Sequence, residues 1–462
     1  MHLYESLLAY AKGETYPMHM PGHKRSPEFV MENPYAWDVT EVDKTDNLHH
    51  PEGIIRAEMD WLQKKYGTKE TYLLVNGSTC GILAAISACC RRGDSIVVAR
   101  NCHRSVYHAI FLLELKPIYL YPQEDVKTGI LLGIQKEQVE EVLTDDVACV
   151  VITSPTYEGV MSDVQEIAES VHEKNIPLIV DEAHGAHFAW SDTMPRTAME
   201  QGADLVVESL HKTLPALTQT ALLHRASERV AAAEIERYLA IYETSSPSYV
   251  LMASISQCVH WLAEKGEIPW QQYKETLSLF EEQAAKWHYL RLWQHPFKEP
   301  SKLIIWTGDS SWTGTDLAEQ LRMSYGMEVE MAEGDYVIAM TTIADTREGI
   351  LKLADALTDM DSKMTEATRS RRKRVPRALV RKNCYEALYG ETKVVPIRQS
   401  KGEIAAEYAF FYPPGIPFLV PGEEITDDVL LHLADAKKYG LTLLGLQDKQ
   451  LETILVCADK EE

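Results

Sequence analysis

Residues 205–214 read Leu-Val-Val-Glu-Ser-Leu-His-Lys-Thr-Leu, an apolar run that is followed at once by hydroxyl and imidazole side chains and by Lys212. A second apolar run, Ile176–Val180, ends upstream in Asp181-Glu-Ala-His-Gly185. Short, continuous apolar runs of this kind are typical of strands in a parallel sheet that is covered on both faces. The sequence thus places an aspartate at the end of one predicted strand and a lysine just after another.

This pairing of a lysine with a strand-end aspartate indicates a particular chemistry. A lysine amine forms an imine with the aldehyde of pyridoxal 5'-phosphate, and a carboxylate keeps the pyridine nitrogen of that cofactor protonated. Hydroxyl and imidazole donors such as Ser209 and His211 suit its phosphate. We therefore expect Lys212 and Asp181 to serve a pyridoxal-phosphate enzyme.

The rest of the chain supports an α/β fold. Further short apolar runs alternate with helical stretches from residue 61 onward, and we expect a mostly parallel central sheet with helices on both faces. The other predicted strands are Tyr72–Val75, Ser95–Ala99, Pro117–Tyr121 and Val147–Thr153.

At 462 residues the chain is too long for a single core. Residues 225–290 read as long helices, and residues 301–360 return to a strand–helix alternation. The predicted parts are an N-terminal segment, a large cofactor-binding domain, a smaller α/β domain with a basic linker, and a C-terminal α+β module, over residues 1–60, 61–290, 291–375 and 376–462.

Further cofactor ligands are predicted at two turns. Ser78 and Thr79 follow a glycine between a predicted strand and a helix, where free N–H groups and hydroxyls favour a phosphate. His103 lies in the loop after Ser95–Ala99, and its imidazole could stack on the cofactor ring. Ala183 is small enough to pack against the opposite face.

Composition excludes several classes of protein. The net charge of −23 argues against a nucleic-acid-binding surface, and the basic run at 369–382 is interpreted as a solvated linker or as a face that pairs with acidic residues. The eight cysteines form no C-x-x-C pair. We therefore expect no metal site at the cysteines, and we expect none at the His184/His187 pair either. No signal peptide or membrane span is predicted, so a cytoplasmic protein is expected.

Taken together, the motifs resemble those of the ornithine/lysine/arginine decarboxylase family of fold-type-I pyridoxal-phosphate enzymes. They occur in order along nearly the whole chain. They are MPGHK at 20–24, TDNLHHPEG at 45–53, NGST at 76–79, RNCHRS at 100–105, SPTYEG at 154–159, DEAHGAHF at 181–188, SLHKTLPALTQTALLH at 209–224, YPPGIP at 412–417 and PGE at 421–423.

The resemblance implies decarboxylation of lysine, arginine or ornithine to the corresponding amine, by a short form that has no N-terminal wing domain. It implies a homodimer or higher homo-oligomer with shared active sites, in which residues 1–60 pack at the site and the dimer interface. The implied catalytic residues are Lys212, Asp181 and His103. The implied cofactor-binding residues also include Ser78, Thr79, Ala183, His184, Ser209 and His211.

Three questions stay open at this level. Glu423, Asp46 and Glu158 are candidates for the acid that meets the distal group of the substrate, and the resemblance places Glu423 at the substrate entrance. His103, Lys212 or another nearby acid could reprotonate the substrate carbon. Transamination, aldol cleavage or racemisation on the same fold is the alternative function, and a non-catalytic homologue is a remote one.

Overall fold

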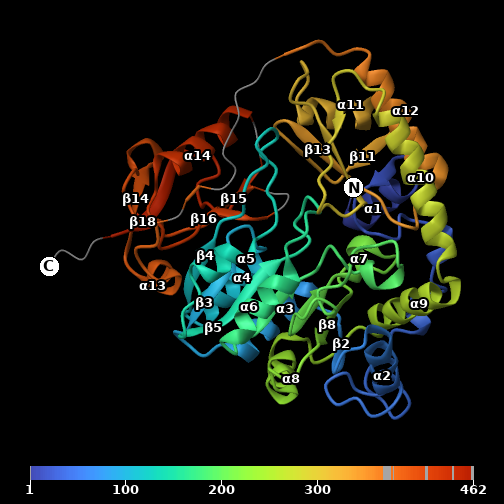
Figure 1. The fold of residues 1–462 in the computed structure, drawn as a ribbon, viewed down its shortest axis with the longest axis horizontal. Helices are drawn as coiled ribbons and strands as arrows, with labels where there is room; N and C mark the ends of the chain where they lie inside the picture. The colour runs from blue at the N-terminus through green and yellow to red at the C-terminus, as the bar shows by residue number, and fades with distance from the viewer. Residues whose placement is uncertain (1, 368–375, 378, 412–414, 440–441, 459–462) are drawn as a thin grey trace.

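The computed structural model of the protein describes residues 2–367, 376–377, 379–411, 415–439 and 442–458 (Figure 1). Residues 369–375 and 378 of the basic run lie outside these residues. No helix among them is both long enough and apolar enough to cross a membrane.

A seven-stranded sheet forms the centre of the molecule, in the order β2-β8-β7-β6-β5-β3-β4. The strand β8 pairs antiparallel with β2 and β7, and the other neighbouring strands pair parallel, so the prediction of a mostly parallel sheet is confirmed. The strands are β2 (Glu70–Leu74), β3 (Ser95–Ala99), β4 (Lys116–Leu120), β5 (Val147–Thr153), β6 (Leu178–Asp181), β7 (Leu205–Glu208) and β8 (Ala221–Arg225).

Both faces of this sheet are buried. Val98 and Val207 belong to one cluster of buried apolar side chains, whereas their neighbours Val97 and Val206 belong to a second cluster. This alternation is the period-two pattern of a strand with helices on each side. The covering helices are α2 (Ile54–Tyr66), α3 (Gly77–Cys89), α4 (Arg104–Leu112), α5 (Lys136–Glu140), α6 (Val164–Glu173) and α8 (Ala232–Tyr242).

A smaller α/β unit follows the long helices α9 (Tyr249–Lys265) and α10 (Ile268–Ala284). Its sheet has the order β12-β13-β10-β9, and α10 packs beside α12 in Figure 1. The elements are β9 (Arg291–Leu292), β10 (Lys302–Trp306), α11 (Gly314–Tyr325), β11 (Met327–Val329), β12 (Met331–Glu333), β13 (Tyr336–Met340) and α12 (Arg347–Asp361).

The N-terminal segment is bound to this smaller unit. After α1 (Leu3–Ala11), the strand β1 (Tyr16–Met18) pairs parallel with β11. The buried Lys24 Nζ then donates to the carbonyl oxygens of Pro17 (3.1 Å), His19 (2.9 Å) and Met340 (2.7 Å). It also lies 3.8 Å from the Asp345 carboxylate.

A C-terminal module lies beside the β4 edge of the central sheet, at the left of Figure 1. It has its own buried apolar cluster, which includes Leu419, Leu433 and Val456. Its elements are α13 (Cys384–Tyr389), β14 (Thr392–Pro396), β15 (Ala409–Phe411), β16 (Pro417–Leu419), α14 (Asp427–Tyr439), β17 (Leu443–Leu444) and β18 (Thr453–Cys457).

Two results differ from the sequence analysis. The strand β8 was not predicted, and it brings His224 and Arg225 into the buried sheet. The largest apolar cluster joins the central sheet to the smaller unit, since it includes both Val207 and Ile305. The boundaries at residues 60, 290 and 375 stay a prediction.

Candidate active site

Lys212 lies in α7 (Leu210–Thr213), a single turn that follows β7 directly. Its Nζ is 3.2 Å from Nε2 of His184. Burial lowers the pKa of the Lys212 ammonium, and Asp181 opposes that shift. The neutral amine, which is the nucleophilic form of lysine, is thereby favoured.

Asp181 ends the neighbouring strand β6, where it pairs in register with Val207 of β7. The side chain is buried, and its Oδ1 accepts a hydrogen bond from Ala183 N at 3.1 Å. Burial raises the pKa of Asp181, whereas the positive charge of Lys212 lowers it. The predicted aspartate and lysine are therefore electrostatic neighbours, as the two strand ends indicated.

Two imidazoles flank the lysine. His103 caps the N-terminus of α4, and its Nδ1 accepts from Ser105 N at 3.3 Å, so the ring proton sits on Nε2. Burial, with the Lys212 charge second, lowers the pKa of His103 to about 3. The same two causes lower the pKa of the buried His184. Both rings are neutral near pH 7 in the chain alone.

Hydroxyls around α7 suit a phosphate. Ser209 Oγ and Thr213 Oγ1 are buried and have no hydrogen-bond partner among the described residues. Ser78 is half-buried and Thr79 is exposed, both in the first turn of α3, whose N-terminal N–H groups favour an anion. His211 Nδ1 lies 2.9 Å from the carbonyl oxygen of Thr220. Orphaned buried hydroxyls need a partner, and a bound phosphate would satisfy them, so these residues fit pyridoxal phosphate.

Glu423, the residue expected at the substrate entrance, is buried and paired in the structure. Its Oε2 accepts from Arg100 Nη2 at 3.2 Å and from Val420 N at 2.9 Å. Neither Glu423 nor Arg100 is more than 2% exposed. The carboxylate thus forms a buried ion pair between the C-terminal module and the end of β3.

The other two candidate acids already accept hydrogen bonds from neighbouring groups. Asp46 accepts hydrogen bonds from five backbone N–H groups, those of Asn47, Glu52, Gly53, Ile55 and Arg56. Burial acts to raise the pKa of Asp46, but these hydrogen-bond donors lower that pKa to about 2. Glu158 is buried and accepts from the hydroxyl of Tyr336 at 3.2 Å.

Sequence reasoning missed three charged or polar groups near the lysine. Tyr157 packs edge-on against His184, with ring centroids 5.3 Å apart, and its hydroxyl donates to Glu330 Oε1 at 2.9 Å. Glu330 raises the pKa of Lys212, whereas the buried Lys302 lowers it. Glu330 and Lys302 come from the smaller unit, so no local pattern around Lys212 signals them.

The two histidines of the H-x-x-H pair have different partners. His184 faces Lys212, whereas His187 Nε2 lies 3.4 Å from Glu299 Oε2. Among the residues that the structure describes, no three His, Cys, Asp or Glu side chains are grouped to hold a metal ion.

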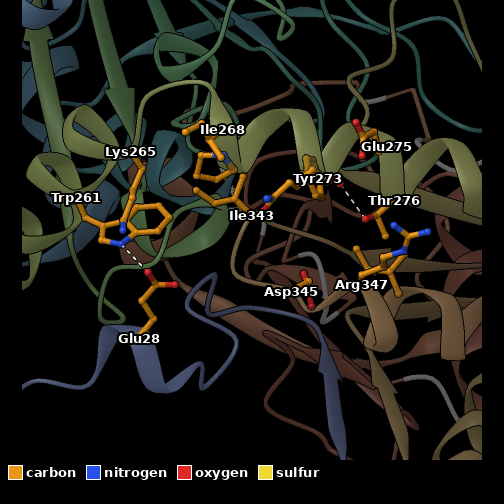
Figure 2. Close-up of a pocket in the computed structure, with 13 residues that line it drawn as sticks. Glu28, Trp261, Lys265, Ile268, Tyr273, Glu275, Thr276, Ile343, Asp345 and Arg347 are labelled. Atoms are coloured by element: carbon orange, nitrogen blue, oxygen red, sulfur yellow. Dashed lines mark hydrogen bonds between the residues drawn. The ribbon is translucent and has the colours of Figure 1, made fainter.

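A separate cavity of about 570 Å³ lies between α9, α10 and the segment before α12 (Figure 2). Trp261 Nε1 donates to Glu28 Oε1 at 3.1 Å across one end of it, and Asp345 forms part of its wall. The cavity therefore borders the two places where the N-terminal segment is anchored.

Comparison with known proteins identifies the family. The chain matches "Orn/Lys/Arg decarboxylase, major domain" over residues 2–325 and the C-terminal domain of the same family over residues 362–447. It is 31% identical to "Arginine decarboxylase" of Bacillus subtilis over 99% of this chain and 98% of that protein. It is 22% identical to the "Constitutive lysine decarboxylase" of Escherichia coli, and the match covers 75% of that longer protein.

Solved structures agree on the fold. The E. coli constitutive lysine decarboxylase superposes with a TM-score of 0.75 at 18% identity, over 98% of this chain and 81% of that one. An aromatic aminotransferase from Pyrococcus horikoshii gives a TM-score of 0.53 at 17% identity over 78% of this chain. The fold is therefore that of fold-type-I pyridoxal-phosphate enzymes, and this chain belongs to the Orn/Lys/Arg decarboxylase family, whose members decarboxylate basic amino acids with pyridoxal 5'-phosphate.

Proposed function

We propose that arginine is the substrate and that the chain removes CO₂ from its α-carbon. The arginine decarboxylases of Bacillus subtilis and Bacillus anthracis are each 31% identical to this chain and match it almost end to end. The lysine and ornithine decarboxylases of E. coli match at 22% and 21%. The observation that carries the reaction is the 3.2 Å contact of Lys212 with His184, beside the buried Asp181.

Each residue at the site has a proposed task. Pyridoxal phosphate, when bound, supplies the sink for the electron pair that CO₂ leaves behind. Lys212 offers its neutral amine to the aldehyde carbon, and Asp181 holds a proton at the ring nitrogen. His103 and Ala183 would hold the ring of the cofactor between them. The phosphate donors are Ser78, Thr79, Ser209 and His211, and His184 orients the Lys212 amine.

We also propose that Lys212, and not His103, returns the proton to the substrate carbon. With a pKa of about 3, His103 carries no second proton to give at neutral pH. Burial lowers the pKa of Lys212, whereas Asp181 and Glu330 raise it, so two carboxylates favour a protonated Lys212 as the proton donor.

Glu330 is the proposed partner of the distal cationic group of the substrate. The Glu330 side chain is half-buried, and its negative charge raises the pKa of Lys212 against the larger lowering by burial. Two hydrogen bonds fix it, from the Tyr157 hydroxyl and from Met20 N, each at 2.9 Å. A guanidinium is recognised by a fixed carboxylate in a bidentate manner.

Glu330→Gln removes the charge, while its amide oxygen can still accept from Met20 N and its amide nitrogen can donate to the Tyr157 hydroxyl. We expect KM for arginine to rise by about tenfold to a hundredfold, since a charged hydrogen bond contributes about 1.5–3 kcal/mol. An unchanged KM would contradict this role. Tyr157→Phe, which removes only one donor to Glu330, is the matched control and should have a smaller effect.

A homodimer is proposed as the minimum assembly. Large apolar side chains are exposed along the N-terminal segment, where a second subunit would cover them. They include Leu3, Tyr4, Leu7, Val30, Tyr35, Trp37, Val42 and Ile54. Light scattering on the eluting protein should give twice the chain mass of 52.3 kDa or a higher multiple.

A cytoplasmic location is likewise proposed. All eight cysteines are free, and Cys90 and Cys149 stay as thiols although their sulfur atoms lie 3.5 Å apart. Free thiols of this kind fit a reducing compartment.

Product analysis by mass spectrometry, after incubation with arginine, lysine and ornithine in turn, tests the substrate directly. Arginine should be converted with the highest kcat/KM, with release of one CO₂ per amine. Preference for lysine or ornithine would overturn the substrate, and formation of a keto acid would overturn the decarboxylation chemistry.

A further inference from the structure

A row of buried polar side chains crosses four strands of the central sheet beneath the active site. In the parallel pair β6–β7, Asp181 lies opposite Val207, so the next residues along, Glu182 and Glu208, are also neighbours. Residues in register on adjacent strands point to the same face of a sheet. Glu182 and Glu208 therefore lie side by side on the face opposite to Asp181.

The row continues through β8 and β2. Val206 lies opposite His224 and Glu208 opposite Leu222, which puts His224 on the same face as Glu208. His224 Nε2 is 3.5 Å from Glu208 Oε2, and His224 Nδ1 is 2.9 Å from the Thr71 hydroxyl.

These groups are closed off from water. Glu182, Glu208 and His224 are each 0% exposed. Ala198 N donates to Glu182 Oε1 at 2.9 Å. The remaining oxygen of Glu182 has no hydrogen-bond donor among the described residues, and Glu208 faces the Tyr66 hydroxyl and His224 Nε2. Two buried, adjacent carboxylates cannot both be ionised without a large desolvation and repulsion cost.

We propose that Glu182 and Glu208 hold one proton between them, and that this shared proton braces the strand end of Asp181 against the strand end that leads into Lys212. Glu182 follows Asp181 directly, and Glu208 precedes Ser209. A hydrogen bond between the two carboxyl groups therefore links the segment that carries Asp181 to the segment that carries Lys212, on the face of the sheet opposite to Asp181. Both are positioning residues, because neither touches the cofactor side of the sheet.

The surroundings are consistent with a neutral Glu182. Burial raises the pKa of Glu182, and Glu208 and Glu200 raise it further. The other titratable groups that face the pair are Tyr66 from α2, His224 from β8 and, behind Tyr66, Cys258 from α9. Tyr66 OH accepts from Trp190 Nε1 at 3.2 Å, and burial also raises its pKa.

The shared proton has a signature in the pH dependence of folding. Above about pH 5.5 the unfolded chain loses the proton of Glu182, whereas the folded chain keeps it, because burial raises the pKa of Glu182. The folding constant of the wild type should therefore fall about tenfold per pH unit relative to a variant that needs no proton. Glu182→Gln, Glu208→Gln and the double variant all lack the shared proton.

Urea unfolding of the full chain between pH 6 and pH 8, with and without cofactor, tests the proton. The ratio of each variant's folding constant to that of the wild type should rise by about tenfold per pH unit, with the same slope for all three. A flat ratio overturns the shared proton. Glu424→Gln is the control. Glu424 pairs with Arg381 on the surface, and Arg381 stays protonated over this pH range, so this ratio should be flat.

The brace is tested by cofactor affinity, measured by titration of the cofactor absorbance. Glu182→Leu should weaken cofactor binding by tenfold or more, and Glu182→Gln should restore it to within about threefold of the wild type. If Glu182→Leu does not fold, Glu182→Asp replaces it in this test, because the shorter side chain keeps the carboxyl group but draws it away from Glu208. Affinity equal to the wild type in the Leu or Asp variant overturns the brace. Neither measurement uses a substrate, so the result is independent of the proposed arginine specificity.

Discussion

Removing the carboxylate of Glu423 should loosen the C-terminal module from the central sheet. Arg100 stands at the end of β3, three residues before His103, and its guanidinium is completely buried. It donates to Glu423 at 3.2 Å and to the hydroxyl of Tyr107 at 2.7 Å. Glu423→Ala would leave a buried guanidinium without its counter-charge.

The expected loss of stability is large. At an effective dielectric constant of about 20, two unit charges separated by 3.2 Å attract by about 5 kcal/mol. Breaking a buried pair by removing one partner costs about 3–5 kcal/mol, because the other charge stays buried. We therefore expect Glu423→Ala to lower the free energy of unfolding by about 3–5 kcal/mol.

The neighbouring Glu424 provides the control. It pairs with Arg381 at 2.7 Å on the surface, so Glu424→Ala should cost about 1 kcal/mol or less. Denaturant unfolding followed by tryptophan fluorescence measures both variants. The relative kcat/KM values for arginine, lysine and ornithine should not change in Glu423→Ala. A change in that preference at unaltered stability would refute a structural role for the Arg100–Glu423 ion pair and support Glu423 as a residue of the substrate entrance.

Lys212→Ala should abolish turnover and the yellow absorbance of the bound cofactor, and wild-type turnover would contradict its assignment. Asp181→Asn should lower kcat by about 10²–10⁴, or about 3–5 kcal/mol in activation free energy, in a steady-state assay. His103→Phe should retain more cofactor affinity than His103→Ala in an absorbance titration, because the ring alone supplies the stacking. Burial lowers the pKa of His211 to about 4, so the unfolded chain binds its proton first as the pH falls. Stability should therefore decrease between about pH 6.5 and pH 4, by up to about 1.4 kcal/mol per pH unit, and His211→Asn should reduce this loss.

The strands of the central sheet were predictable because their residues are apolar without interruption. The prediction Ser95–Ala99 matches β3 to the residue, and Val147–Thr153 matches β5. The sequence did not predict the strand β8, because this strand ends in His224 and Arg225, and such polar residues are usually exposed to solvent. Their partners, Thr71 and Glu70, are about 150 residues away in the chain.

In the active site too, local sequence predicts some residues, whereas contacts between distant parts of the chain determine others. Lys212 and Asp181 follow their own strands, so local order was enough to pair them. Glu330 reaches the site from the smaller unit, and only the folded chain shows it beside Tyr157. Glu423 carries a motif that the resemblance singles out, but its partner, Arg100, lies more than 300 positions upstream.

The attachment of β1 and Lys24 to the smaller unit has a consequence for limited proteolysis. The chain between Val30 and Val42 is exposed, with Tyr35 86% accessible, so a protease can reach it in a single subunit. A cut there would divide the backbone without releasing the N-terminal peptide, because the β1–β11 pairing and the Lys24 hydrogen bonds would keep it docked. The nicked protein would elute as one species under native conditions and separate into two fragments only in denaturant.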